Sequence, residues 1–275
     1  PEGPPVLLLP ALGRQLLDWD GSFCESLGAA GLRIIRIDHR DSGLSPSIDA
    51  RKVDIAELLQ AVRSGGPYEA PYLLVDMADD IIRLMDALQI ESAHIVGTSM
   101  GGMIGQTMAA HYPNRVRTLT SIMSTTGSRT VGRPASREAA ALLWTAPPPD
   151  RARAIAFLVA AREVLAGGGP FDARQAQLEE SAAFDRAFAP AGSGRQLAAV
   201  VASGDRTDEL AAVAAPTLVI HGTNDPLIDP SGGEATANAI PRARFLAIEG
   251  MGHHFTFPEP FRGPVIAAVL AHVAG

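Results

Sequence analysis

The chain has 275 residues, of which 47% are hydrophobic and 19% are charged. This length and composition are typical of a compact protein with one large domain, or one domain with an insertion, and they exclude a disordered or fibrous chain. The 23 basic and 30 acidic residues give a formal net charge of −7. A nucleic-acid partner is therefore not expected, because binding to phosphates requires a basic surface.

The apolar segments are too short to cross a membrane. A membrane-spanning helix requires about 20 predominantly apolar residues, whereas candidates such as Val265 to Ala274 are shorter and contain His272. The single cysteine, Cys24, cannot form an internal disulfide. These features predict a soluble, cytoplasmic protein without a membrane partner, although a chain that begins at Pro1 leaves open a cleaved signal.

Short apolar runs alternate along the chain with amphipathic segments. Nearly continuous apolar runs are typical of parallel strands that are buried on both faces, and helices of this length between them indicate crossover connections. The sequence therefore predicts an α/β fold with a mostly parallel sheet. The predicted strands are Val6 to Leu9, Arg33 to Ile37, Ala93 to Val96, Val116 to Met123, Thr217 to His221 and Arg244 to Ile248, and the predicted helices include Ser22 to Ala30, Leu73 to Leu88 and Gly102 to Tyr112.

The segment 127–208 interrupts this alternation. It contains no convincing strand, and prolines and glycines punctuate its alanine-rich helical stretches. We interpret it as a helical insertion between a core formed by residues 1–126 and 209–275. Because predicted strands flank it, we expect it to lie over the carboxyl edge of the sheet, where open α/β sheets bind ligands.

The strongest local motif is Gly97-Thr98-Ser99-Met100-Gly101, which has the pattern G-x-S-x-G. It follows a predicted strand and opens a predicted helix, the setting in which the central serine is held on a sharp turn with its hydroxyl exposed. The helix N-terminus then stabilises negative charge that develops nearby. We predict that Ser99 is a nucleophile and that the Met100 N–H donates to an oxyanion.

A nucleophilic serine needs a histidine base and an acid, which follow it in this motif class in the order Ser, Asp, His. Asp225 comes directly after the strand that ends near His221, so we favour it as the acid over Asp229. For the base we favour His253 over His254, because it follows Gly252 and its loop then runs into Phe255 and Phe257.

The loop after the first strand should supply a second oxyanion donor, for which Leu12 N–H is the candidate. The segment 38–43, with its opposed charges, is interpreted as a hydrogen-bonded turn. No HExxH, CxxC, Walker A or post-strand GxGxxG pattern occurs. We expect neither a metal nor a cofactor.

These motifs resemble those of the α/β-hydrolase superfamily over nearly the whole chain. The segments 97–101, 222–225 and 250–253 are similar to its nucleophile, acid and histidine loops, and the insertion is similar to its helical cap. The segments 7–17, 37–41, 97–102 and 250–253 resemble most the esterase branch that contains the aclacinomycin methylesterases. Two features depart from the family: Pro10-Ala11 replaces the more usual His-Gly or Met-Gly, and the usual N-terminal antiparallel hairpin has no counterpart before Val6. We therefore expect this sheet edge to be missing, replaced or lost by truncation.

The resemblance and the motifs together predict a serine esterase that cleaves a carboxylic ester of a small to medium apolar molecule through an acyl-enzyme. A carbon–carbon bond hydrolase or a cofactor-free perhydrolase would use the same triad, and a non-catalytic ligand-binding protein of the same fold is the alternative of another class. The sequence indicates no oligomeric state. Candidate substrate contacts in the insertion are Trp144, Phe157, Leu158, Phe171, Phe184 and Phe188.

Overall fold

The computed structural model describes residues 3–48, 53–254 and 256–275. Its centre is a six-stranded sheet with the strand order β2-β1-β3-β4-β5-β6, in which every neighbouring pair is parallel. The strands are β1 (Pro5–Leu9), β2 (Arg33–Arg36), β3 (Ala93–Thr98), β4 (Val116–Ile122), β5 (Thr217–Gly222) and β6 (Arg244–Ile248).

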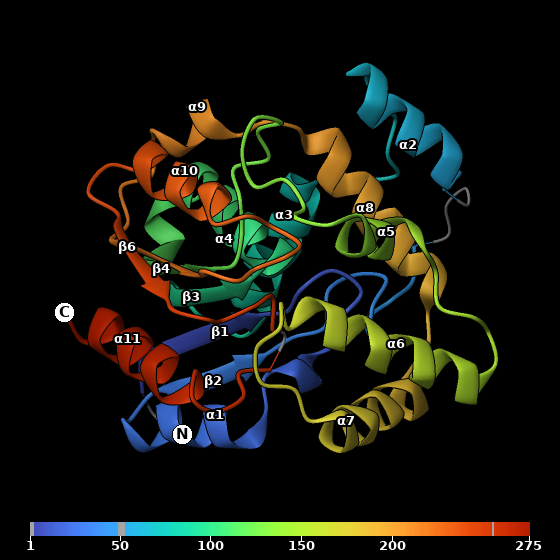
Figure 1. Cartoon of the computed structure of the whole chain (residues 1–275). Coiled ribbons are helices and arrows are strands. Elements are labelled where there is room, and N and C mark those ends of the chain that lie inside the picture. Colours follow the sequence, from blue (N-terminus) through green and yellow to red (C-terminus); the bar gives the residue numbers. More distant parts are fainter. Residues whose placement is uncertain (1–2, 49–52, 255) are drawn as a thin grey trace.

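Helices cover both faces of this sheet, as Figure 1 shows: α3, α4 and α10 lie on one face, and α1 and α11 lie on the other. The helices that lie outside the segment 127–208, or overlap only its last two residues, are α1 (Gly21–Ala29), α2 (Ile55–Ser64), α3 (Leu74–Ala87), α4 (Met100–His111), α9 (Thr207–Leu210), α10 (Ser231–Ala239) and α11 (Arg262–Ala274). Short 3₁₀ turns occur at η1 (Leu16–Asp18) and η2 (Pro113–Arg115).

The sheet separates two apolar clusters, which explains the nearly continuous apolar sequence of its central strands. On β1, Leu7 and Leu9 join the cluster that includes α3 and α4, whereas Val6 and Leu8 join the cluster that includes α1 and α11. All four side chains are fully buried. A strand whose alternate side chains both enter a core has no polar face, as expected for a parallel sheet that is covered on both sides.

The segment 127–208, all of which the structure describes, contains no strand and forms the helices α5 (Arg137–Trp144), α6 (Arg151–Leu165), α7 (Ala173–Arg186) and α8 (Pro190–Ser203). The first three begin at Ser136, Asp150 and Asp172, whose side chains accept a hydrogen bond from the helix backbone. Such N-caps stabilise a helix start by about 1 kcal/mol. Figure 1 shows these helices gathered beyond one end of the sheet.

Polar side chains fasten α8 to the loops that follow β1 and β2. Arg195 donates two hydrogen bonds to Asp41, at 2.9 and 2.6 Å, and Tyr72 donates to the same carboxylate at 2.7 Å. Gln196 accepts from Gly13 N–H at 2.7 Å and donates to the Arg40 carbonyl at 2.8 Å. The predicted hydrogen-bonded turn at 38–43 is therefore a docking point for the helical segment.

The predicted α/β class with a parallel sheet is confirmed, and the six predicted strands match the observed ones closely. Among the described strands none is antiparallel, so the sheet has no hairpin in this part of the chain. Within the same residues, no helix has the length and apolar character needed to cross a membrane.

Candidate active site

Ser99 lies on a sharp turn between β3 and α4. Its φ of 51° and ψ of −118° place it in a left-handed conformation that side chains other than glycine rarely adopt. Strain of this kind persists only where the surrounding structure enforces it. Here Ser99 N–H donates to the Ile122 carbonyl at 2.9 Å, and Ser124 Oγ donates to the Ser99 carbonyl at 2.9 Å.

The glycines that flank this turn are required by close backbone contacts. A Cβ atom on Gly97 would lie 2.2 Å from the Gly101 carbonyl oxygen, and one on Gly101 would lie 2.2 Å from the Leu9 carbonyl oxygen. Neither backbone oxygen can move away easily. The pattern G-x-S-x-G is thus explained by the packing of the turn against itself and against β1.

Asp225 and His253 form a buried hydrogen-bonded pair. The His253 Nδ1 atom lies 2.7 Å from Asp225 Oδ2, and the two residues are only 3% and 1% exposed. Asp225 follows β5, whereas His253 belongs to the loop between β6 and α11. His253 and Ser99 line the same cavity. The structure therefore brings all three predicted residues to one site.

The loops that carry this pair are fastened to each other by backbone hydrogen bonds. Asn224 N–H donates to the Met251 carbonyl at 3.0 Å, and Gly250 N–H donates to Thr223 Oγ1 at 2.8 Å. The histidine loop also rests on the end of α6, because His253 N–H donates to the Leu165 carbonyl at 2.8 Å. These bonds fix the position of the imidazole from two sides.

Four donors surround the Asp225 carboxylate. Oδ1 accepts from the N–H groups of Leu227 and Ile228, both at 2.9 Å, while Oδ2 accepts from His253 and lies 3.2 Å from His221 Nε2. Burial alone would raise the pKa of Asp225, but the adjacent His253 and the hydrogen bonds from both histidines outweigh burial and hold that pKa well below its usual range. Asp225 is therefore ionised at neutral pH.

Asp229 and His254, the alternative candidates for the acid and the base, lie in different surroundings from Asp225 and His253. Asp229 Oδ1 accepts from Ser231 N–H at 3.0 Å, just before α10. His254 lines a second, smaller pocket of about 80 Å³, and burial lowers its pKa to about 4. Phe255, one of the two residues behind the choice of histidine, lies outside the described residues, whereas Phe257 packs against Trp19 and Phe23.

The loop after β1 is held in place close to the serine. Burial lowers the pKa of His39 to about 4, so the ring is neutral, and its Nε2 lies 3.2 Å from the Pro10 carbonyl oxygen, to which it donates. Gly13, with a φ of 69°, donates its N–H to Gln196. These contacts hold Leu12, which lines the same cavity as Ser99 and Met100. Met100 is the first residue of α4, so its N–H has no partner within the helix.

A buried polar network lies beneath the strained turn. Gln106 on α4 donates to Ser121 Oγ at 3.0 Å and to Ser124 Oγ at 3.4 Å. Its amide oxygen accepts from Arg206 Nη2 at 3.2 Å, and the same guanidinium donates to the Thr125 carbonyl at 2.8 Å. Burial lowers the pKa of Arg206 to about 10. The network connects this buried cation, through Gln106 and Ser124, to the backbone of the serine.

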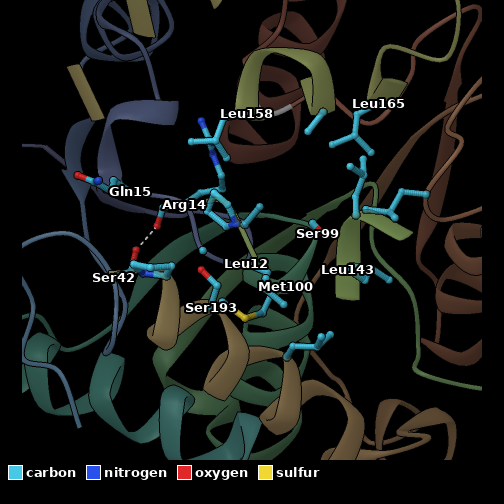
Figure 2. Close-up of a pocket in the computed structure, with 18 of the residues that line it drawn as sticks. Leu12, Arg14, Gln15, Ser42, Ser99, Met100, Leu143, Leu158, Leu165 and Ser193 are labelled. Atoms are coloured by element: carbon cyan, nitrogen blue, oxygen red, sulfur yellow. Dashed lines mark hydrogen bonds between the residues drawn. The ribbon is translucent and has the colours of Figure 1, made fainter. Parts of the chain in front are cut away.

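A cavity of about 350 Å³ opens above Ser99. Figure 2 shows Ser99, Leu12 and Met100 on the sheet side of this cavity, with Leu158 on the side of the helical segment. Its wall is mainly apolar, as in most small-molecule sites. The apolar side chains that the helical segment contributes include Leu142, Leu143, Phe157, Leu158, Leu165, Phe184 and Phe188.

One side of the cavity is a cluster of paired charges. Arg14 forms salt bridges at 2.8 Å with Asp18 and with Glu180, and Arg162 contacts Glu179 at 2.6 Å and Glu180 at 3.3 Å. Of the charged residues that line the cavity, Arg14 and Arg162 are cationic and Asp41 and Glu180 are anionic. Apart from His253, the cavity thus carries balanced charge, with both cations already bound to carboxylates.

Of the six predicted substrate contacts, Phe157, Leu158, Phe184 and Phe188 line the cavity. Trp144 instead packs against the cluster of Leu58 and Leu197, and Phe171 lines the smaller pocket. Sequence reasoning missed His221 beside Asp225, as well as the charge cluster and the network beneath Ser99. These residues come from distant parts of the chain and carry no local motif.

A parallel six-stranded sheet, with a serine on a strained turn after its third strand in chain order, has the architecture of the alpha/beta hydrolases. The chain belongs to the alpha/beta hydrolase fold family, whose sequence model matches residues 4–260. This confirms the predicted resemblance.

Individual relatives match the chain over part or nearly all of its length. The rhodomycin D methylesterase DauP of a Streptomyces species is 30% identical, over 99% of the chain and 91% of that protein. The 3-oxoadipate enol-lactonase 1 of Acinetobacter baylyi is 27% identical, over 64% of the chain and 63% of that protein. Among solved structures, the meta-cleavage product hydrolase from Pseudomonas fluorescens IP01 superimposes with a TM-score of 0.77 at 21% identity, over 99% of the chain and 91% of that protein.

Proposed function

We propose that the protein is a serine esterase that hydrolyses a carboxylic ester of a small to medium, mostly apolar and uncharged molecule. The observation that carries this proposal is the His253–Asp225 hydrogen bond of 2.7 Å at a cavity that Ser99 also lines. The similarity to a methylesterase over nearly the whole chain favours an ester among the substrates of this family. The paired charges of the cavity favour a neutral substrate, since no cation is left over to bind an acid.

In the proposed mechanism, Ser99 Oγ attacks the ester carbonyl while His253 Nε2 accepts the hydroxyl proton. Asp225 holds the Nδ1–H tautomer of His253 and stabilises the imidazolium that forms. The Met100 and Leu12 N–H groups donate to the negative oxygen of the tetrahedral intermediate. His253 then returns the proton to the departing alcohol, which leaves an acyl group on Ser99.

Water completes the cycle. His253 accepts a proton from a water molecule, the resulting hydroxide attacks the acyl carbonyl, and the Ser99 oxygen leaves and is reprotonated by His253. The products are the carboxylic acid and the alcohol, so no external oxidant, reductant or metal takes part in these steps.

We propose further that the segment 127–208 is a cap that sets the substrate range. Phe157, Leu158, Phe184 and Phe188 form its apolar contribution to the cavity. A chromogenic ester with a small acyl group would depend little on these side chains, whereas larger esters would depend on them strongly.

The Ser99→Ala variant tests the proposed function. In a complete triad, loss of the nucleophile lowers kcat by about 10⁶-fold, and a fluorophosphonate probe no longer labels the protein. Ser193→Ala is the matched control, because Ser193 also lines the cavity but has no part in the proposed chemistry. Ester hydrolysis retained by Ser99→Ala would refute the assignment, and a wild-type protein that no probe labels would point to a ligand-binding protein instead.

A further inference from the structure

His221 is a fully buried histidine at the end of β5 with an unusual set of neighbours. Its Nε2 atom lies 2.8 Å from the Ile228 carbonyl oxygen and 3.2 Å from Asp225 Oδ2. Its Nδ1 atom is buried, and the described residues offer that atom no hydrogen-bond partner. A neutral imidazole carries one N–H group, and both neighbours of Nε2 are acceptors. The proton therefore resides on Nε2, which donates to the Ile228 carbonyl oxygen and stands 3.2 Å from Asp225 Oδ2.

Helix α10 maintains this arrangement from the other side of the ring. A Cβ atom on Gly233 would lie 2.4 Å from His221 Nδ1 and 3.0 Å from its Cγ. The ring thus rests directly on the backbone of α10, which presents no acceptor to Nδ1. Packing and hydrogen bonding both select the same orientation and the same tautomer.

Asp225 Oδ2 consequently faces two imidazole nitrogens, His253 Nδ1 at 2.7 Å and His221 Nε2 at 3.2 Å. We propose that His221 is a positioning residue for the reaction: its Nε2–H holds Oδ2 of Asp225 in the orientation that His253 requires and moderates the charge that His253 experiences. This inference rests on the proposed function. His221 does not line the cavity, so it acts through Asp225 and not on the substrate.

The effect of the His221 Nε2–H group on His253 is measurable as a pH effect. An N–H dipole points its positive end at the carboxylate, so its removal makes the potential at His253 more negative and favours the protonated imidazole. Because the reaction needs the neutral base, the ascending limb of kcat/KM against pH should then move to higher pH. Two other ionisable groups lie near this pair: His254 in the same loop, which interacts electrostatically with both His253 and Asp225, and Arg162 on α6, which lines the same cavity as His253. A substitution at position 221 alters neither side chain.

The experiment compares His221→Phe with His221→Gln. Phenylalanine keeps an aromatic ring, slightly larger than imidazole, but lacks the donor, whereas the glutamine amide can donate from nearly the same place as Nε2. For His221→Phe we expect kcat to fall about 10- to 100-fold, the range for a lost hydrogen bond to a charged group, with little change in KM and with the ascending limb at higher pH. His221→Gln should keep most of the wild-type kcat, with the ascending limb of kcat/KM at the wild-type pH.

A loss of kcat that is equal in both variants, without a shift of the limb, would overturn the proposal and leave His221 a packing residue. If His221→Phe does not fold, Gly233→Ala provides the decision, because its Cβ would displace the His221 ring from Asp225 without removing any donor group from the chain. Gly263→Ala on α11 is its control, since nothing lies within 4 Å of a Cβ there. An ascending limb of kcat/KM against pH that shifts in Gly233→Ala but not in Gly263→Ala supports the proposal. An unshifted limb in Gly233→Ala refutes it.

A spectroscopic measurement separates this inference from the proposed function. The proton in the His253 Nδ1–H···Asp225 bond gives a low-field resonance that can be followed in Ser99→Ala, which does not turn over. Its position should change in the double variant Ser99→Ala/His221→Phe. An inactive wild type would refute the esterase while this resonance still tests the role of His221, and an unchanged resonance would refute that role even in an active esterase.

Discussion

Asp225→Asn should impair catalysis strongly, because the carboxylate has no orientation that tolerates an amide. Oδ2 faces two histidine nitrogens and Oδ1 faces two backbone N–H groups at 2.9 Å. An amide nitrogen at Oδ2 opposes the donors of His253 and His221, and an amide nitrogen at Oδ1 opposes those of Leu227 and Ile228. The protein can relieve the first conflict only by turning His253 to the tautomer that cannot accept the serine proton.

The expected loss follows from this tautomer. Removal of the negative acid in a serine triad lowers kcat by about 10⁴-fold, which corresponds to about 5.4 kcal/mol of transition-state stabilisation at about 1.36 kcal/mol per factor of ten. KM should change little, because Asp225 does not line the cavity.

The measurement is the steady-state hydrolysis of a chromogenic acetate ester across the neutral pH range, with far-ultraviolet circular dichroism as a check of the fold. Asp229→Asn is the matched control: Asp229 stands four residues away, accepts from Ser231 N–H, and should tolerate the change with nearly wild-type kcat. A kcat of Asp225→Asn within tenfold of wild type, or a larger loss in Asp229→Asn, would refute the assignment of the acid.

Two further predictions concern stability. Gly101→Ala should destabilise the fold by about 1–3 kcal/mol in a urea titration, because its Cβ would lie 2.2 Å from the Leu9 carbonyl oxygen. In the same titration, Gly28→Ala on the exposed face of α1 should be neutral or stabilising. Equal stability of the two variants would contradict the close contact at Gly101. Because the pKa of Asp225 in the folded protein lies below its ordinary value of 3.8, its contribution to stability is present above that pH and is lost as the pH falls further. Wild type should therefore lose more unfolding free energy than Asp225→Asn between about pH 5 and pH 2.5, and parallel curves would disprove this linkage.

The parts of the site that could be predicted from sequence are those that a single segment specifies. Ser99 was identifiable because the turn needs its glycines within two residues on either side. Asp225 and His253 were identifiable because parallel strands place their following loops at the same edge of the sheet. In each case local backbone geometry and chain order were sufficient to choose the residue.

The parts that escaped prediction depend on contacts between distant segments. His221 looks like any histidine at the end of a strand until the chain folds back and brings Asp225 to its Nε2. Gln196 holds the loop at Gly13, which is 183 positions away. Trp144 and Phe171 have the composition expected of a substrate wall, but the direction of each side chain is set by helix packing that periodicity alone does not fix.

The contact between the loop that carries His253 and the end of α6 has a consequence for engineering this chain. A Cβ atom on Gly252 would lie 2.5 Å from the carbonyl oxygens of Leu165 and Ala166, and His253, the proposed base, donates its backbone N–H to the Leu165 carbonyl. The last turn of α6 thus supports the loop that carries His253 and also contributes Leu165 to the cavity wall. A chimaera that exchanges the proposed cap for that of another hydrolase should keep residues 165 and 166, with the splice junction placed ahead of them, so that the loop of His253 keeps its support.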